Sequence, residues 1–403
     1  MAHTTGTPAA GSRRIESIDA LRGLVMVIMA LDHVRDFVHR GAMSGSPTDL
    51  ATTTPALFLT RWVTHICAPV FMLTAGMGAF FWWQRGRSRG ELSWFLLSRG
   101  VWLIVLEVTV MRLAYNFSVS AQYPLLLIVL WALGGCMIVM AALVWLPVPV
   151  LAAVSLVAIA GHNLLDGVDP GRLGISTGVW NVIHQPGLVP GLGATVFVAY
   201  PLVPWVAVMA LGFCLGPVFQ WDSPRRERFL LATGVAATAG FVVLRWVDGY
   251  GDPAPWSAQR SPVYTLLSFL NTTKYPPSLL FLLMTLGPAL LLLAWLDRRG
   301  MRATGPLVVF GRVPLFYFVL HFYLAHLAVV VLSVVTYGTA AWGFVFGPVP
   351  SMGGPKELFP AGFGWSLGVA YLVWAVVVVG LYPVCRWFAG VKARRRDWWL
   401  GYL

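Results

Sequence analysis

The chain has 403 residues, of which 58% are hydrophobic and only 11% are charged, and its mean hydropathy is +0.74. A composition this apolar excludes an ordinary soluble domain and indicates an integral membrane protein. The net charge of +12 does not indicate nucleic-acid binding, because the basic residues form short clusters between apolar runs, where they set membrane topology.

The first 14 residues are small and polar, and we expect them to be disordered on the cytoplasmic side. The apolar run that follows is long enough to span a membrane and lacks a signal-peptide cleavage pattern. Similar runs recur along the chain and predict an all-α, polytopic helical bundle of about ten transmembrane helices. The predicted spans are 17–38, 59–83, 93–114, 124–145, 148–164, 194–219, 228–247, 276–296, 307–336 and 364–386.

The positions of the basic residues predict that both termini face the cytoplasm. With the N-terminus inside, most of the 28 Lys and Arg residues fall in segments on the inner side. An even number of spans then places the C-terminus on that side too. The predicted transmembrane domain covers 15–388, and 389–403 form a basic cytoplasmic tail.

Ionisable residues gather at the end of the first predicted span. On a helix they fall within an arc of about 160°. Charge inside a bilayer is costly unless it is paired or meets water, so this face predicts a solvated pocket near the outer side. The alternative is a helix end that has reached the headgroup region, which explains His39 and Arg40 equally well. The cluster consists of Asp32, His33, Arg35, Asp36, His39 and Arg40.

Three further spans carry isolated ionisable residues. Arg61 and His65 are four residues apart and share a helix face, as do Tyr317 and His321. An arginine that reaches the interface beside a neutral, hydrogen-bonded histidine is an equally good interpretation of the first pair. Glu107 lies deep in the third span, where a carboxylate is expected to be protonated or bonded to an arginine.

The sequence lacks the motifs of the common catalytic and metal sites. No Ser-His-Asp spacing, phosphate-binding glycine loop or HExxH motif is present, and the four cysteines lie in apolar surroundings without paired spacing. We therefore predict no metal site. Chemistry would rest on His33, because Asp36 three residues on can hold the ring tautomer while the other nitrogen acts as base or nucleophile. This pair suits acyl transfer, and it suits a proton-coupled transporter or permease equally well.

Four motifs carry a resemblance to a known family. They are IDALRG with ALDHVRDF (18–37), TRWVTHICAPVFMLTAG (60–76), NTTKYPPSLLF (271–281) and FGRVPLFYFVLHF (310–322). In this order they resemble the transmembrane acyltransferase superfamily. The likeness is to bacterial relatives of the catalytic domain of lysosomal heparan-alpha-glucosaminide N-acetyltransferase.

The resemblance implies transfer of an acetyl or other acyl group from cytoplasmic acyl-CoA to an amine or hydroxyl across the membrane. The acceptor would be a glycan or a small molecule. The protein would lie in the cytoplasmic membrane of a bacterium, where its helices contact the membrane lipid. In a related branch the catalytic histidine follows the opening aspartate by fourteen residues, which from Asp19 is His33. In the heparan enzyme the active histidine lies further on, where His39 is the nearest candidate.

The chemistry of the residues and the resemblance together predict the site residues. The catalytic group would be His33 with Asp32 and Asp36, while His65 and His321 complete the outer pocket. Candidates for the phosphates of acetyl-CoA or another acyl-CoA are Arg22, Arg99, Asn271 and Lys274, because phosphate requires fixed cations or helix N-termini. The proton-coupled transporter remains the alternative function, and a homodimer is one oligomeric state that the sequence leaves open.

Overall fold

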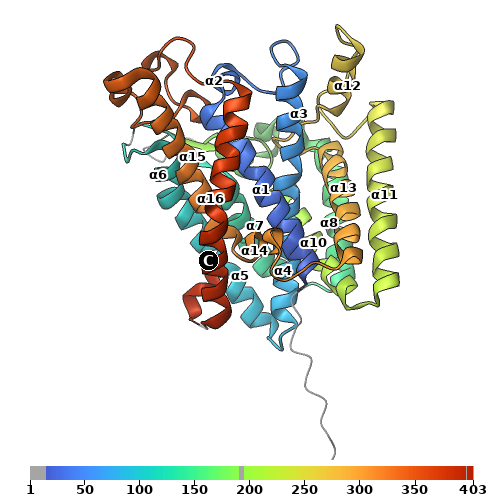
Figure 1. The fold of residues 1–403 in the computed structure, drawn as a ribbon. Helices are drawn as coiled ribbons and strands as arrows, with labels where there is room; N and C mark the ends of the chain where they lie inside the picture. Colours follow the sequence, from blue (N-terminus) through green and yellow to red (C-terminus); the bar gives the residue numbers. More distant parts are fainter. Residues whose placement is uncertain (1–14, 121, 190–194, 396, 403) are drawn as a thin grey trace, which may run out of the picture.

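The computed structural model describes residues 15–120, 122–189, 195–395 and 397–402, most of which form helices that run along a common direction (Figure 1). The predicted N-terminal segment 1–14 lies outside the described residues. Eight helical segments in the described part are long and apolar enough to cross a membrane. They are Pro55–Trp83, Arg89–Asn116, Val148–Leu165, Val203–Gln220, Ser223–Val247, Leu279–Arg299, Pro314–Gly343 and Leu367–Arg394.

Two further helices lie at the two remaining predicted spans, 17–38 and 124–145, but neither is among the eight segments of the described chain that are long and apolar enough to cross a membrane. α1 (Glu16–Val38) has 23 residues but carries more charge than the other spans, and α7 (Val129–Leu143) is apolar but has only 15 residues. α1 runs through the middle of the bundle (Figure 1), where α4, α13, α14, α15 and α16 contact it. The structure therefore confirms the all-α polytopic bundle.

Several of the long helical segments are interrupted by short stretches of 3-10 or π-helix. The long segments comprise α3 (Pro55–Val63), η1 (Thr64–Ile66) and α4 (Cys67–Trp83); α5 (Arg89–Leu106), the π-turn Glu107–Met111 and α6 (Arg112–Asn116); α8 (Val148–Gly161); α10 (Val203–Leu215); α11 (Ser223–Val247); α13 (Leu279–Arg299); α15 (Pro314–Tyr337); and α16 (Leu367–Arg394). The short helices are α2 (Arg40–Ser44), α9 (Thr177–Ile183), α12 (Pro262–Leu270) and α14 (Pro306–Arg312).

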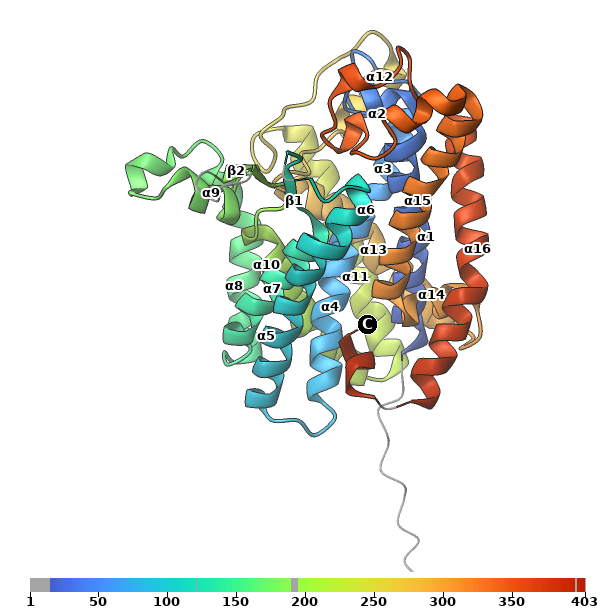
Figure 2. The ribbon, with the colours of Figure 1, turned by 90° about the vertical axis from the view of Figure 1, so that its left-hand side faces the viewer.

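The two ends of the chain lie at the same end of the bundle. α1 begins there at Glu16 and α16 ends there at Arg394 (Figures 1 and 2). We call this the inner end, following the predicted topology. The opposite, outer end carries α2, α9, α12 and a small sheet (Figure 2). In that sheet β3 (Val196–Val198) lies between β1 (Leu125–Leu127), which is parallel to it, and β2 (Gly187–Val189), which is antiparallel.

The prediction of one continuous ninth span over 307–336 is wrong. α14 ends at Arg312, and α15 starts at Pro314 after Val313, which has φ −131° and ψ 49°. The proline is the reason, because its ring drives the preceding residue out of the helical region while suiting the first turn of a new helix. The break lets α14 pack closely against the inner half of α1.

Close packing of α1 and α14 depends on two glycines. A Cβ atom at Gly23 would overlap the backbone carbonyl of Leu307, and one at Gly311 would overlap that of Asp19. The overlap is with backbone, so a side chain cannot rotate away to relieve it. The two helices therefore approach at a distance that only glycine permits.

We expect Gly23→Ala to lower the free energy of unfolding by about 1 to 3 kcal/mol, the usual cost of overpacking a core. Gly380→Ala on α16 is the matched control, because no atom of the described residues outside its own helical turn lies within 4 Å of a Cβ there. That exchange should leave stability unchanged or raise it by up to about 1 kcal/mol, since alanine favours helix. Thermal unfolding of the two detergent-solubilised variants checks this; equal midpoints would show that α1 and α14 can separate at no cost.

Glu107 pairs with no arginine among the described residues, which contradicts one of the two interpretations of the sequence. Its carboxylate accepts hydrogen bonds from the Tyr115 hydroxyl (2.9 Å) and from the backbone N–H groups of Leu130 (2.7 Å) and Trp131 (3.0 Å). These two N–H groups belong to the first turn of α7, where the helix dipole favours a negative group. Glu107 thus fixes α7 against α5.

The basic segment at the inner end folds back on the bundle. α16 continues to Arg394, and the 3-10 helix η9 (Trp398–Tyr402) lies against α5. The Tyr402 hydroxyl is 3.0 Å from that of Ser98, and Arg99 donates a hydrogen bond to the Gly401 carbonyl. Part of the predicted tail is therefore packed structure.

Candidate active site

The ionisable face of α1 meets two other helices in the outer half of the bundle. Arg61 and His65 come from α3 and the 3-10 turn that follows it, and His321 lies about two turns after the start of α15. Pro55 starts α3 at the outer end, so Arg61 and His65 lie well inside the span. The side chains are largely buried, because the rings of α13 and α15 surround them.

Two arginines and two aspartates form a buried ionic network. Arg35 Nη2 is 2.9 Å from Asp32 Oδ1 and 2.6 Å from Asp36 Oδ1. Arg61 Nη1 donates to the other oxygen of Asp32. Only 1% of the Arg35 side chain is exposed, and its Nε and Nη1 atoms are buried without a hydrogen-bond partner in the described structure. Buried N–H donors of a charged group favour binding of an oxygen-bearing ligand or water.

His33 lies at the edge of this network. Its Nδ1 atom is 3.9 Å from Asp36 Oδ2, which is within ion-pair range but longer than a hydrogen bond. His33 Nδ1 has no hydrogen-bond partner in the described structure, so the predicted hydrogen bond by which Asp36 would hold the ring tautomer is not formed. The His33 ring packs against Phe322 (4.1 Å between centroids) and His321 (5.3 Å), and 17% of its side chain is exposed.

His321 has a defined tautomer. Its Nδ1 atom is 3.1 Å from the Tyr317 carbonyl oxygen, which can only accept a hydrogen bond, so Nδ1 carries the proton. Nε2 is then an unprotonated acceptor, and it is buried without a partner among the described residues. The ring also stacks on Tyr317, four residues earlier, as the sequence spacing predicts. A buried basic nitrogen beside His33 suits proton transfer.

His65 and Lys274 lie further along the same site. His65 is 4% exposed and packs against Phe281 of α13, and its Nδ1 atom has no hydrogen-bond partner in the described part of the chain. Lys274 interacts electrostatically with Asp32, His33 and His65. Arg35, Arg61 and Lys274 therefore face Asp32 and Asp36, which leaves one surplus positive charge at the site.

His39 and Arg40 serve the connection that follows α1. His39 Nδ1 accepts a hydrogen bond from the Gly41 N–H (3.1 Å), and Arg40 Nη2 donates to the Gly364 carbonyl (3.3 Å). Burial, with the nearby guanidinium groups of Arg35 and Arg40, lowers the pKa of His39 below its usual value. His39 caps α2 in this structure and lies beyond the buried network.

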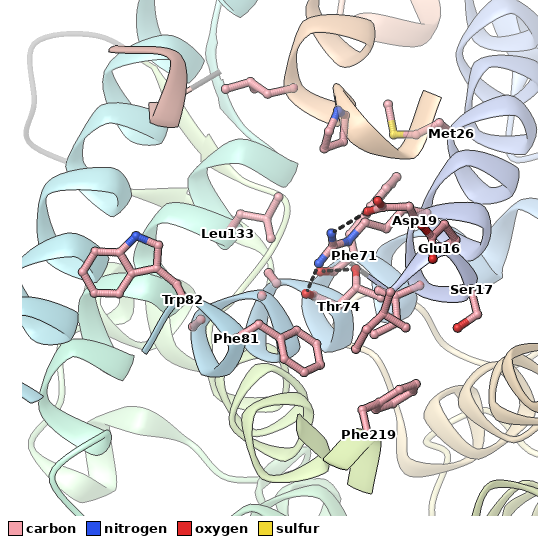
Figure 3. Close-up of a pocket in the computed structure, with 18 of the residues that line it drawn as sticks. Glu16, Ser17, Asp19, Met26, Phe71, Thr74, Phe81, Trp82, Leu133 and Phe219 are labelled. Carbon is pink, nitrogen blue, oxygen red and sulfur yellow. Dashed lines mark hydrogen bonds and ion pairs between the residues drawn. The ribbon is translucent and has the colours of Figure 1, made fainter. Parts of the chain in front are cut away.

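A large cavity opens at the inner end of the bundle. It has a volume of about 1260 Å³ and is lined by α1, α4, α5, α7, α13 and α15. Figure 3 shows Asp19 and Met26 on one side of the open space, with Leu133 and Trp82 on the other. Trp82 stacks on Phe95 with centroids 4.4 Å apart. The cavity therefore combines a charged mouth with an aromatic and aliphatic wall.

Four arginines line the inner cavity. Arg22 donates hydrogen bonds to the Thr74 carbonyl and to Asp19 (3.5 Å; Figure 3), and Arg226 Nε is 2.7 Å from Asp297. Arg85 and Arg99 complete the set. Guanidinium groups of this kind bind phosphate with two parallel hydrogen bonds.

The deep end of the cavity approaches the outer site. Met26 of α1 and Phe318 of α15 line it. Phe318 is one helical turn before His321, and the two rings are 5.5 Å apart. Phe318 thus lies between the cavity and His321, whereas Phe322 packs on the His33 ring and does not line the cavity.

The structure separates the four predicted phosphate-binding residues. Arg22 and Arg99 line the inner cavity, whereas Lys274 lies beside the outer network. Asn271 is also at the outer end, where its side chain donates to the Thr48 carbonyl (3.2 Å). One phosphate group cannot contact all four residues, and the assignment of any of them to the acyl-CoA phosphates stays a prediction. The segment 271–278 leads into the outer end of α13, as the predicted topology of the eighth span requires.

Sequence reasoning missed the role of Arg35 and the pairing of Arg61. Arg35 was one of several residues on the ionisable face, yet it joins both aspartates. Arg61 was weighed as an interfacial residue, but it binds Asp32 across helices. The available signal was charge balance, since two carboxylates within one span require nearby cations.

Comparison with known proteins identifies the family of the chain. No curated protein matches the sequence. The family model described as heparan-alpha-glucosaminide N-acetyltransferase, catalytic, matches residues 14–244, which is more than half of the chain and includes Arg22, His33, Arg61, His65 and Arg99. With the bundle of membrane-length helices, this match shows that the chain belongs to the heparan-alpha-glucosaminide N-acetyltransferase catalytic family, a family of transmembrane acetyltransferases.

Proposed function

We propose that this protein transfers an acetyl group from acetyl-CoA, bound in the inner cavity, to an amine or hydroxyl of a glycan or small molecule at the outer end. Its location would be the cytoplasmic membrane of a bacterium. The observation that carries the proposal is the continuity of α1 and α15, which line the cavity and also hold His33 and His321.

The distance between the arginines of the inner cavity and His33 matches the length of the donor, acetyl-CoA. His33 follows Arg22 by eleven residues on α1, which corresponds to about 16 Å along the helix axis. An extended phosphopantetheine arm has a comparable length. Phosphates held near Arg22 and Arg99 would place the thioester near His33, with the arm passing Met26 and Phe318. The stacked rings of Trp82 and Phe95 at the wall suit contact with an adenine base.

The outer residues suit acyl transfer. His33, with His321 beside it, would remove the proton from the acceptor amine or hydroxyl as that group attacks the thioester carbonyl. Negative charge then develops on the carbonyl oxygen, and the surplus positive charge of Arg35, Arg61 and Lys274 would stabilise it. The carbon–sulfur bond breaks, and the thiolate of coenzyme A leaves toward the inner cavity. An acyl-histidine at His33 is the alternative to direct transfer.

The function is tested with purified protein in proteoliposomes. Labelled acetyl-CoA is enclosed on the side of the inner end, and an impermeant amino sugar is supplied at the outer end. Acetylated sugar should accumulate outside, with one free thiol released inside per product. Sugar acetylation that needs no enclosed thioester would contradict the proposal, as would proton-driven sugar uptake without any acetylation, which is the behaviour of a transporter.

We expect Arg22→Gln and Arg99→Gln to raise the KM for acetyl-CoA about tenfold each, because a charge-assisted phosphate contact contributes about 1.4 kcal/mol or more. The turnover number should change little, since neither residue approaches the thioester. Arg298→Gln is the control, because that side chain is 74% exposed and contacts Glu227. Initial rates against acetyl-CoA concentration measure the effect; an unchanged KM in both cavity variants would place the nucleotide elsewhere.

A further inference from the structure

A second hollow lies on the outward face of α16, near its inner end. It has a volume of about 390 Å³. Its lining residues all belong to this helix and recur about every four positions, so they share one face. They are Tyr382, Pro383, Arg386, Trp387, Gly390 and Arg394.

The opposite face of α16 anchors the helix to the bundle. Leu381, Cys385 and Phe388 are buried there, and the Phe388 ring stacks on Phe316 of α15 with centroids 4.2 Å apart. α16 stands at the edge of the bundle (Figure 2). The hollow therefore faces away from the protein, toward the surrounding membrane.

The depth of the hollow corresponds to the headgroup region. The apolar part of α16 from Leu367 to Cys385 rises about 28 Å, close to the thickness of the hydrocarbon core of a bilayer. Arg386 follows directly, and Arg394 lies two turns further on, about 12 Å toward the aqueous phase. Trp387, which is 62% exposed, has the position typical of interfacial tryptophan.

The two arginines of the hollow lack acidic partners. In the described part of the chain, no carboxylate lies within 4.0 Å of either guanidinium group, whereas neighbouring Arg395 is 3.9 Å from Asp397. Gly390 separates them and leaves the space open. A Cβ at this position would come within 3.1 Å of Arg394 Nη1, so a larger side chain would occupy the hollow.

We propose that this hollow binds one anionic phospholipid, with the headgroup phosphate between Arg386 and Arg394. Its acyl chains would follow the exposed apolar surface that continues outward along α16, where Val376 is 65% and Val379 72% exposed. The charges favour a phosphate, and the membrane depth, Trp387 and the apolar surface favour a lipid as its source over a free phosphate ion.

Lipid binding can be measured by native mass spectrometry of the full chain in mixed micelles with equal amounts of phosphatidylglycerol and phosphatidylcholine. Wild-type protein should retain one molecule of phosphatidylglycerol in preference to phosphatidylcholine. The double variant Arg386→Gln/Arg394→Gln should bind it about thirtyfold more weakly, as expected from about 1 kcal/mol for each basic residue at the headgroup level. Arg298→Gln/Arg299→Gln on α13 removes the same charge from the inner end and should retain the lipid.

A third variant distinguishes binding in the hollow from non-specific attraction of the lipid to the positive charge of the two arginines. Gly390→Leu keeps both arginines but fills the space between them, and leucine favours helix more than glycine, so folding should not suffer. It should lose the bound lipid like the double arginine variant. Retention of phosphatidylglycerol by Gly390→Leu, an equal loss in the α13 variant, or displacement of the lipid by millimolar inorganic phosphate would each overturn the proposal.

Discussion

Replacing His33 by alanine should lower the turnover number for acetyl transfer about a thousandfold. Loss of a positioned general base typically costs between about a hundredfold and ten-thousandfold. His33 is the histidine that lies both beside the basic Nε2 of His321 and within ion-pair range of Asp36. Transfer of labelled acetyl groups to an amino sugar in proteoliposomes measures the effect, with the thermal midpoint confirming that the variant is folded.

His39→Ala is the matched comparison for this experiment, because it removes an imidazole six residues further along the chain. His39 caps α2 through its contact with the Gly41 N–H. Its removal should reduce turnover by less than about threefold, since loss of a cap costs only about 1 kcal/mol of local stability. Undiminished turnover in His33→Ala, with loss of turnover in His39→Ala, would move the reactive histidine to the outer loop.

Replacing Asp32 by alanine should lower the free energy of unfolding by about 3 to 5 kcal/mol. Breaking a buried ion pair has this cost, because it leaves an uncompensated charge in a medium of low dielectric constant. Asp32 is the shared partner of Arg35 and Arg61, whose side chains are 1% and 14% exposed. Equilibrium unfolding in mixed detergent micelles measures the loss.

The exposed pair of Arg87 and Glu91 provides the control. These side chains are 50% and 51% exposed and 3.3 Å apart. Arg87→Ala should cost less than about 1 kcal/mol, since water already screens the pair. The double variant Asp32→Leu/Arg61→Leu should recover most of the stability lost in Asp32→Ala. It removes both charges of the Asp32–Arg61 pair and leaves Arg35 paired with Asp36. An Asp32→Ala effect no larger than that of Arg87→Ala would show that the network is solvated rather than buried.

Much of the candidate site was visible in the sequence because charge within an apolar run is rare. The ionisable face of α1, the i,i+4 pair of Tyr317 and His321, and the position of Arg22 near the inner end were all predicted. Which cations would pair with which carboxylates across helices was not predicted. The association of Arg61 with Asp32 depends on the rotation and depth of α3 relative to α1, and neither follows from a hydropathy profile.

The length and apolarity of each helix are local properties, so the sequence by itself determined that the chain is a helical membrane bundle, with its basic residues toward one end. Tertiary packing decided the rest. It split the ninth span at Pro314, turned Glu107 toward the first turn of α7, and brought the charge of Lys274 within electrostatic range of Asp32. The physical reason is that burial requires each charge to find a partner, and those partners come from segments far apart in the chain.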